Sequence, residues 1–374
     1  MFDEAKTFER AVAKVTKTAQ RVKDTLPYRT VNGKFDDWSV SDPSWWTNGF
    51  WPGLLWLTWR ETKNPDLALW AEGAETRLDS TLDAYFGLHH DVGFMWHLSS
   101  VARYRLAGGE SARRRGLHAA NLLAGRFNLA GRFLRAWNDD KTGWAIIDCL
   151  MNLPLLYWAS TETGDPRFRQ VAEAHTETVM KHFLFADGSV KHIVEFDPKT
   201  GAYVCNHAGQ GYSVNSAWSR GAAWALHGLA LGAQATGRAD FLACAQKVAA
   251  FFVRNLPDDF VPRADFKAPQ DERNHKDSSA AACAASGLLL LAILVPEPDR
   301  AALTQGARSI LDSLTSSYAD WDGDEALLQH GCGAYVNDRP GWEDTSLIYG
   351  DYFYLEALAR LHGRPGLFYS VKQP

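Results

Sequence analysis

Six short turn signals, spread along the whole chain at fairly regular intervals, constrain its fold more than any other feature. Each combines glycine or proline with a polar residue that can cap a helix, which is the chemistry that ends one helix and begins the next. They begin at residues 62, 107, 163, 236, 295 and 362. The segments between them are long enough for a helical hairpin plus a return loop, so we expect a repeated helix–turn–helix unit.

The segments that flank these turns are rich in Ala, Leu and Gly and apolar on most faces, which is typical of helices buried on several sides. We expect inner helices at 51–61, 92–106, 146–162, 218–235, 278–294 and 347–361. Their partners, such as 168–183 and 241–256, mix charged and apolar positions and indicate an outer ring. Six inner and six outer helices predict an all-α fold, an (α/α)6 barrel of six helical hairpins. A solenoid or bundle would give a similar pattern, so closure of the ring is an inference.

We expect one catalytic domain over residues 1–374, because closed barrels exceed the usual length of a domain. The longest irregular stretch, 185–216, predicts a functional loop. A net charge of -5 and scattered Lys and Arg residues argue against a nucleic-acid partner. The apolar run 280–295 is shorter than the roughly 18 residues of a membrane span and predicts a buried helix.

The start of the chain is charged and carries no export signal. The five cysteines are odd in number, lie far apart and form no C-x-x-C pair, so they indicate neither a disulfide framework nor a zinc site. We therefore expect a cytoplasmic protein that does not interact with a membrane.

The chain contains 15 Trp, and aromatic residues make up 12% of it. A large aromatic core is one interpretation, since Trp dominates core burial generally. Several Trp nevertheless lie in polar, loop-like contexts, where they could stack on the apolar faces of sugar rings. These are Trp38, Trp45, Trp46, Trp137, Trp321 and Trp342.

Polar clusters stand just before the expected inner helices, so in an up-and-down barrel they would all face one end. They lie at 46–49, 89–91, 148, 192–220, 275–278 and 343–345. Helix capping is the alternative, because Asp, Asn, Ser and Thr are favoured at helix N-termini for backbone reasons alone. We interpret Asp277 and Asp344 as helix caps.

Asp148 does not fit a capping role, because it lies in an apolar segment where an ionised carboxylate is expensive. Desolvation raises the pKa of a carboxyl and a second carboxylate raises it further, which keeps an acid protonated near neutral pH. Asp148 is therefore the candidate general acid. Asp91, preceded by two histidines, is the candidate second carboxylate, with helix capping as the alternative.

A metal site at His89, His90 and Asp91 is another interpretation of this run. Adjacent positions do not share a helix face, and no second ligand pair stands at helical spacing. We expect no metal and no cofactor.

Arg220 enters an otherwise apolar helix beside Trp224. An unpaired guanidinium would be costly there, and its planar fork binds a carboxylate bidentately. We expect Arg220 to bind a carboxylate of the substrate. The alternative is an internal ion pair with an Asp or Glu of a neighbouring helix.

A further pattern is carried by six segments, which read WTNGFWPG (46–53), HDVGFM (90–95), IDCLMNLPL (147–155), WSRG (218–221), DSSAA (277–281) and GDYFYLEA (350–357). In order and spacing these segments resemble the unsaturated glucuronyl hydrolases of glycoside hydrolase family 88, from about residue 40 to about residue 360. The resemblance implies an (α/α)6 barrel. Its expected substrate is a small oligosaccharide, made by a polysaccharide lyase, with a 4,5-unsaturated uronic acid at its non-reducing end.

The chemistry implied by this resemblance is vinyl-ether hydration instead of displacement at the anomeric carbon. An Asp protonates carbon 4 of the unsaturated ring, water adds at carbon 5, and the resulting hemiketal opens and expels the partner sugar. The resemblance implies that Asp148 is this acid/base and that Asp91 orients it and stabilises the cationic transition state. It also implies that His192 and Gln210 contact the sugar ring, that Arg220 and Trp224 contact the uronate side, and that Trp46 forms a stacking wall. His90 and Trp137 complete the expected substrate contacts.

The C-terminal segment partly resembles a Ser-x-x-Ser-x-Lys pattern with which some family members hold a substrate sulfate. Ser370 and Lys372 match this pattern, while Leu367 stands where the first Ser would be. We include Ser370 and Lys372 among the expected substrate contacts and leave the sulfation preference open.

Three alternatives remain at this point. The family 105 rhamnogalacturonyl hydrolases share the fold and the chemistry. A sugar epimerase on the same barrel would use paired His, and a non-catalytic glycan-binding barrel would need neither Asp. The sequence is compatible with a homodimer and does not fix the oligomeric state.

Overall fold

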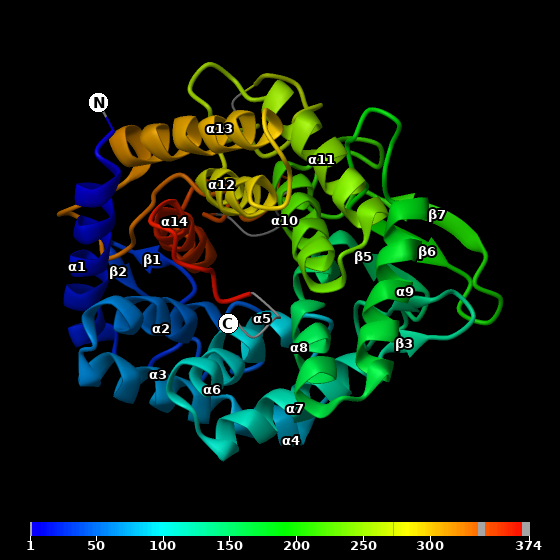
Figure 1. Cartoon of the computed structure of the whole chain (residues 1–374), viewed down its shortest axis with the longest axis horizontal. Coiled ribbons are helices and arrows are strands. Elements are labelled where there is room, and N and C mark those ends of the chain that lie inside the picture. The colour runs from blue at the N-terminus through cyan, green and yellow to red at the C-terminus, as the bar shows by residue number, and fades with distance from the viewer. Residues whose placement is uncertain (1, 272, 336–340, 369–374) are drawn as a thin grey trace.

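The protein is a ring of paired helices (Figure 1). The computed structural model describes residues 2–271, 273–335 and 341–368. The inner ring consists of α2 (Phe50–Thr62), the continuous run α5 (Val92–Trp96), η1 (His97–Val101) and α6 (Ala102–Ala107), then α8 (Pro154–Thr163), α10 (Ser219–Thr236), α12 (Ser278–Ala292) and α14 (Ile348–Leu361). The outer ring consists of α1 (Glu4–Val22), α3 (Pro65–Arg77), α7 (Glu110–Ala124), α9 (Pro166–His182), α11 (Ala239–Arg254) and α13 (Asp299–Ser313).

Shorter elements connect these helices. They are α4 (Asp79–Ala84), the 3₁₀-helix η2 (Ile147–Met151), the π-helical turn η3 (Leu314–Tyr318), and the strands β1 (Thr30–Val31), β2 (Lys34–Phe35), β3 (Phe127–Asn128), β4 (Phe133–Leu134), β5 (Trp144–Ile146), β6 (Ile193–Phe196) and β7 (Tyr203–His207).

The ring closes where α14 packs against α2. Five of the six turn signals join an inner helix to the next outer helix, and the sixth follows α14. The outer helix that packs on α14 is α1, so the sixth pair comes from opposite ends of the described chain. The predicted (α/α)6 barrel is confirmed, and closure excludes a solenoid.

The turn between α8 and α9 shows why the sequence folds in this way. Gly164 ends α8 in the left-handed conformation at φ +73°, which glycine adopts without steric cost. Asp165 caps α9 by accepting a hydrogen bond from the backbone N–H of Arg167, and Pro166 occupies the first helical turn.

The predicted buried helix in the apolar run after residue 278 is also confirmed, because every residue of α12 is buried. In the described residues, the helices are all too short or too polar to serve as a membrane-spanning segment.

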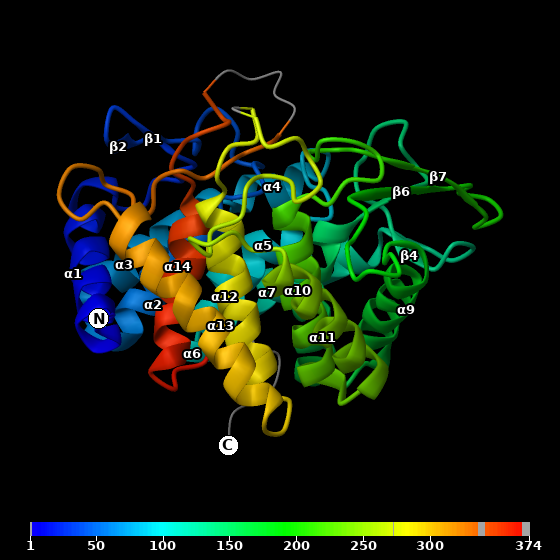
Figure 2. The ribbon, with the colours of Figure 1, turned by 90° about the horizontal axis from the view of Figure 1, so that it is seen from above.

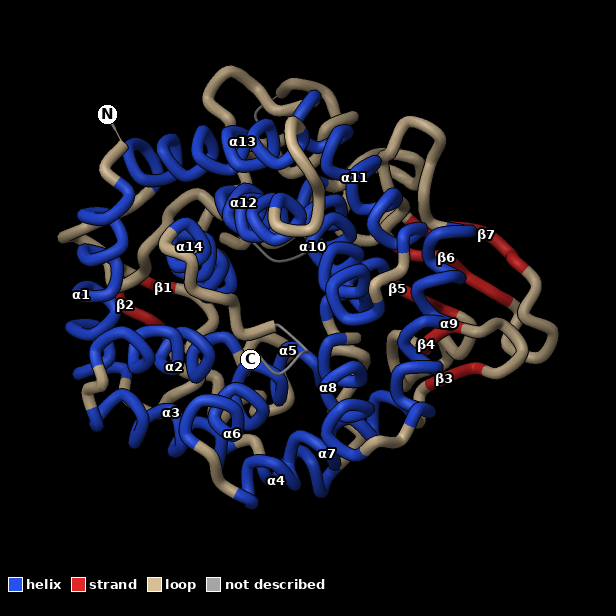
Figure 3. Tube along the Cα trace, in the orientation of Figure 1, coloured by secondary structure: helices blue, strands red, loops and turns tan. Residues whose placement is uncertain are grey.

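The expected inner helix 146–162 differs from the observed structure. The chain runs as strand β5 to Ile146, continues as η2, and becomes α-helical only at Pro154. The irregular stretch 185–216 contains β6 and β7, which form an antiparallel sheet with β5 at the flank of the ring (Figure 3). Aromatic and β-branched residues in β5 and β6 pair across this sheet, and such residues favour strands.

The two ends of the barrel differ (Figure 2). Long loops and the strands lie at one end, where the inner helices begin, and short turns lie at the other. The polar clusters that precede the inner helices therefore gather at the loop end.

Candidate active site

A cavity of about 350 Å³ opens at the loop end of the barrel. Its walls come from the segments that precede α2, α5 and η2 and from the loop after β7. The lining residues are Asp42, Ser44, Trp45, Trp46, Gly87, His89, His90, Asp91, Met95, Trp137, Ile146, Asp148 and Gln210. The cavity therefore brings together both candidate catalytic carboxyls and four of the expected substrate contacts, Trp46, His90, Trp137 and Gln210.

Asp91 is paired with His90. The His90 Nδ1 atom lies 3.1 Å from the carbonyl oxygen of Ala136, which can only accept a hydrogen bond, so Nδ1 carries the ring proton. Burial lowers the pKa of His90 to about 4, so the ring is neutral at neutral pH and its Nε2 is an acceptor. This Nε2 lies 3.1 Å from Asp91 Oδ1, which matches a protonated Asp91 that donates to His90.

The surroundings of Asp91 also favour its protonated form. Burial raises the pKa of Asp91 well above its usual range, and the negative charge of Asp148 raises it further. Asp91 stands at the N-cap position of α5, but its side chain caps no backbone N–H there. Helix capping is therefore not its role.

Asp148 faces a second histidine, His192. The His192 Nδ1 atom accepts from the backbone N–H of Gln210 at 2.8 Å and also lies 3.3 Å from the Ala208 carbonyl oxygen. The His192 Nε2 atom lies 3.5 Å from Asp148 Oδ2. Among the described residues, neither Nε2 nor Oδ2 has a partner at hydrogen-bonding distance and angle.

Burial and the neighbouring charge of Asp148 thus raise the pKa of the second candidate carboxyl, Asp91, which the sequence did not single out for this effect. Since the two groups interact, the proton and its titration belong to the pair.

Asn152, which sequence reasoning missed, links the two carboxyl-bearing segments. Its Oδ1 accepts from the backbone N–H of Phe94 at 2.7 Å, and its side chain also hydrogen-bonds Asp91. A Cβ on Gly93 would lie 2.4 Å from the Asn152 backbone, so only glycine permits this approach. The four-residue spacing between Asp148 and Asn152 was the feature of the sequence that could have identified Asn152 as a neighbour of the site.

His192 lies behind Asp148 and is buried. Its ring packs on Trp218 with centroids 4.2 Å apart. The adjacent loop passes so close that a Cβ on Gly209 would meet His192 Nδ1 at 2.0 Å, and Gly209 has φ +59°. His192 is therefore held toward Asp148, and its expected role as a sugar-ring contact stays a prediction.

Arg220 is fully buried, and the internal ion pair is the alternative that the structure shows. Its Nη1 lies 2.9 Å from Asp277 Oδ2 and also donates to the Cys332 carbonyl. Its Nη2 donates to the Gly333 carbonyl at 2.6 Å and to Gln210 Oε1 at 3.1 Å. The internal ion pair that the sequence left open as the alternative is therefore present, and Arg220 contacts the cavity lining through Gln210.

Trp224, another expected substrate contact, does not line the cavity. It is fully buried and packs on Phe94 and Phe353 with ring centroids 5.4 and 5.5 Å away. Trp46 does line the cavity and is backed by Tyr349 at 5.0 Å. Trp224 lies on an apolar helix and Trp46 on a loop, and the sequence alone did not show which of the two lines the cavity.

Trp137 lies on a segment fixed by Arg126, another residue that sequence reasoning missed. The Arg126 guanidinium donates to Asn138 Oδ1 at 2.6 Å and to the Ala136 carbonyl at 3.0 Å. The ring of Trp137 stands edge-on to His90, with centroids 5.9 Å apart.

The two predicted helix caps differ. Asp277 caps α12 by accepting from Ser279 and Ala280 backbone N–H groups, as expected. Asp344 Oδ1 instead lies 2.9 Å from His330 Nδ1. Asp344 is not the N-cap residue of α14, which is Leu347, so its interpretation as a helix cap was wrong. Ser370 and Lys372 lie outside the described residues.

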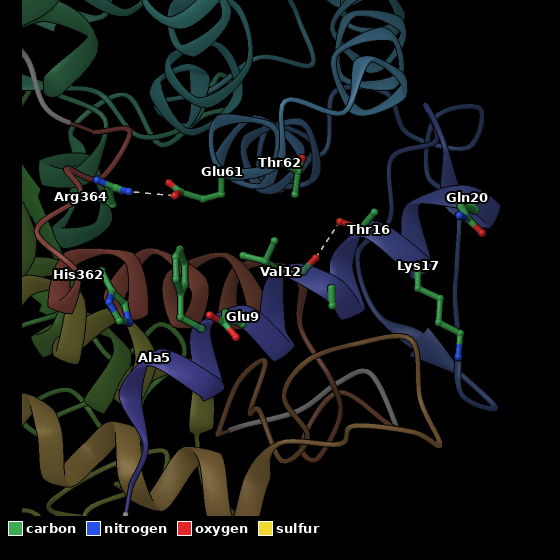
Figure 4. Close-up of a pocket in the computed structure, with 12 residues that line it drawn as sticks. Ala5, Glu9, Val12, Thr16, Lys17, Gln20, Glu61, Thr62, His362 and Arg364 are labelled. Carbon is green, nitrogen blue, oxygen red and sulfur yellow. Dashed lines mark hydrogen bonds and ion pairs between the residues drawn. The ribbon is translucent and has the colours of Figure 1, made fainter.

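A second, larger groove of about 770 Å³ lies at the ends of α2 and α14 and along α1 (Figure 4). Glu61 and Arg364 pair across it, with Oε2 and Nε 3.4 Å apart. It holds neither of the two candidate carboxyls, and the aromatic rings in its lining are Phe8 and His362 instead of tryptophans. The loop-end cavity is therefore the candidate active site.

A barrel of paired helices whose end cavity is lined by the two candidate catalytic carboxyls and by three Trp fits a carbohydrate-active enzyme. The family model for Glycosyl Hydrolase Family 88 matches residues 11–320. The chain is 36% identical over 364 residues to an unsaturated glucuronyl hydrolase of Bacillus sp. (strain GL1), covering 94% of this chain and 96% of that protein. It is 33% identical to an unsaturated chondroitin disaccharide hydrolase of Streptococcus pyogenes serotype M1, covering 88% and 84%.

The crystal structure of the unsaturated glucuronyl hydrolase from Bacillus sp. GL1 superimposes with a TM-score of 0.92 at 34% identity, over 99% of this chain and 100% of that chain. The chain belongs to glycoside hydrolase family 88. It is a glycoside hydrolase.

Proposed function

We propose that the protein removes the 4,5-unsaturated uronic acid from the non-reducing end of lyase-generated oligosaccharides of the glycosaminoglycan type. The observation that carries this proposal is the pair of carboxyls, Asp91 and Asp148, in a cavity with Trp walls. The relatives that act on unsaturated glucuronyl and unsaturated chondroitin substrates support this substrate class. The described barrel would act as one catalytic domain.

The proton of the pair is proposed to move during catalysis. At rest it lies on Asp91, directed at His90. It passes to Asp148, whose Oδ2 lacks a hydrogen-bond partner among the described residues, and from Asp148 to carbon 4 of the substrate. Both carboxyls are then negative, and they stabilise the positive charge that develops at carbon 5 and the ring oxygen.

Water then adds at carbon 5 and gives one proton back to the pair. The resulting hemiketal opens, the partner sugar leaves, and the site returns to its starting protonation state. The proton is conserved over the cycle, so the reaction needs no redox partner.

Gln210 is the proposed polar contact to the unsaturated sugar. Arg220 holds its side-chain oxygen, so its amide offers N–H donors to a carboxylate or hydroxyl of the substrate. Trp46 and Trp137 supply flat apolar surfaces for sugar rings.

The experiment that tests this function follows the ultraviolet absorbance of the carbon 4–carbon 5 double bond in lyase-generated disaccharides. Wild-type protein should remove the absorbance and release one partner sugar per double bond lost. Asp148→Asn should do neither, whereas Asp140→Asn, a change of an exposed carboxylate outside the cavity lining, should behave as wild type. Loss of absorbance without release of the partner sugar would reject the proposal.

A further inference from the structure

Three potential metal ligands of different chemistry converge on one face of the flanking sheet, outside the catalytic pair. Glu195 lies on β6, and Cys205 and His207 lie on β7. Glu195 and Cys205 are directly paired across the two strands, and His207 is two residues beyond Cys205, so all three side chains project from the same face. Figures 1 and 3 show these strands at the edge of the ring of helices.

The three ligand atoms lie within 4.8 Å of one another. Glu195 Oε2 is 2.7 Å from His207 Nε2 and 3.4 Å from Cys205 Sγ, and Sγ is 3.6 Å from Nε2. In a tetrahedral zinc site, bonds of about 2.0–2.3 Å place ligand atoms about 3.4–3.6 Å apart. Two of the three edges already have this length, and the third needs to widen by about 0.7 Å, which a small rotation of the carboxylate supplies.

We propose that Glu195, Cys205 and His207 form a binding site for a zinc-class divalent ion. Thiolate, imidazole and carboxylate together form a ligand set suited to zinc and to cobalt, and poorly suited to calcium or magnesium. Binding replaces the thiol proton of Cys205, which passes to solvent, with a sulfur–metal bond. Three protein ligands leave a fourth position for water.

The surroundings orient the ligands and leave them accessible. The His207 ring stacks on Trp144 with centroids 4.0 Å apart and planes 21° apart, which fixes the direction of Nε2. The Glu195 and His207 side chains are each 32% exposed, so an ion can enter from solution. A bound ion would clamp β6 to β7 on the face that Trp144 of β5 covers.

The site adjoins the active-site cavity without sharing residues with it. Trp144 is in edge contact with Trp137, a cavity-lining residue, at 6.0 Å between centroids. Strand β5 leads directly into η2, which carries Asp148. The ion would therefore stabilise the flank of the cavity and take no part in the proton transfers of the Asp91–Asp148 pair.

The alternative is a metal-free cluster in which Cys205 and His207 both donate to Glu195. The two can be separated by adding Co²⁺ to tag-free, fully reduced protein after chelator treatment. A thiolate bound to Co²⁺ gives an ultraviolet charge-transfer band, and tetrahedral Co²⁺ gives visible absorption. We expect both signals to saturate at one ion per chain and to be displaced by Zn²⁺.

Cys205→Ser should abolish the charge-transfer band, and His207→Ala should weaken Co²⁺ binding at least about 10-fold. Cys244→Ser, a change at another half-buried free cysteine on α11, is the matched control and should leave the spectrum unchanged. Circular dichroism of each variant tests that it is folded. A wild-type protein without the charge-transfer band, or a Cys205→Ser variant that keeps it, would overturn the site.

Discussion

Two pairs of ionisable side chains lie at the loop end of the barrel, and they differ in how many of their polar atoms have hydrogen-bond partners. In the Arg220–Asp277 pair, both side chains are buried, and carbonyls, backbone N–H groups and Gln210 bond all of their polar atoms except Arg220 Nε, which has no partner among the described residues. In the Asp91–Asp148 pair, each carboxyl side chain stays 14% exposed, and Asp148 Oδ2 has no hydrogen-bond partner among the described residues.

This difference in hydrogen bonding separates carboxylates that stabilise the barrel from carboxylates that are available for catalysis. Asp277 caps α12 and neutralises Arg220, so its charge is fully used by the fold. The Asp91–Asp148 pair keeps two like groups close together around one proton, which is unfavourable for stability and suited to acid–base catalysis. The predictions below test this contrast.

The largest effect is expected on turnover at Asp148. Asp148→Asn keeps the size of the side chain but cannot exchange a proton, so kcat should fall on the order of 10²–10⁴-fold. The free energy of unfolding should change little, because Asp148 makes no saturated ion pair. Steady-state kinetics and urea unfolding of the same preparation measure both, and more than a tenth of wild-type kcat would contradict the assignment.

At Arg220 the expected effect is on stability. Arg220→Ala leaves the Asp277 charge buried without its partner, which should lower the free energy of unfolding by about 3–5 kcal/mol. Urea unfolding measures this change. If stability is unaffected and only KM for the unsaturated sugar rises, then Arg220 contacts the substrate directly and the internal pair is not its main role.

Asp91→Asn tests whether the proton of the pair moves. Asn can donate to His90 Nε2 but holds no transferable proton and develops no charge, so we expect a severe loss of kcat with the His90 contact retained. Nearly unchanged kcat would show that the Asp91 proton stays on Asp91 throughout the reaction. Single-turnover kinetics at saturating substrate makes the comparison.

The same variant carries a pH-dependent stability effect. The pKa of Asp91 is raised in the folded protein, so folding favours its protonated form. The stability that wild type gains from this protonation is fully present below the unfolded pKa of about 4 and is lost as pH rises through the folded pKa. Wild-type unfolding free energy should therefore fall relative to Asp91→Asn over this window, and a pH-independent difference would contradict the raised pKa.

The barrel was predictable from turn signals and helix periodicity, because glycine, proline and capping residues act locally. The sheet β5–β6–β7 was not, since its strands are short and pair across about 50 residues of sequence. Asp91 and Asp148 were identified because each stands at the loop end in a distinctive local context. The protonated form of Asp91 depends on its burial and on the nitrogen that His90 presents to it, and only tertiary contacts, such as that of His90 with Ala136, decide these.

Arg220 and Trp224 are more deeply buried than the sequence indicated, and for the same reason. Both lie on α10, whose residues are buried from Ser219 to Ala233. The partner of Arg220 comes from the N-terminus of α12, 57 residues away in sequence.

The most direct test of the account compares one disaccharide in its 4,5-unsaturated and saturated forms. Protonation at carbon 4 requires the double bond, so wild-type protein should release the partner sugar from the unsaturated form only. The rate on the saturated form should not exceed that of Asp148→Asn. Release from both forms at similar rates would contradict hydration of the double bond and point to displacement at the anomeric carbon.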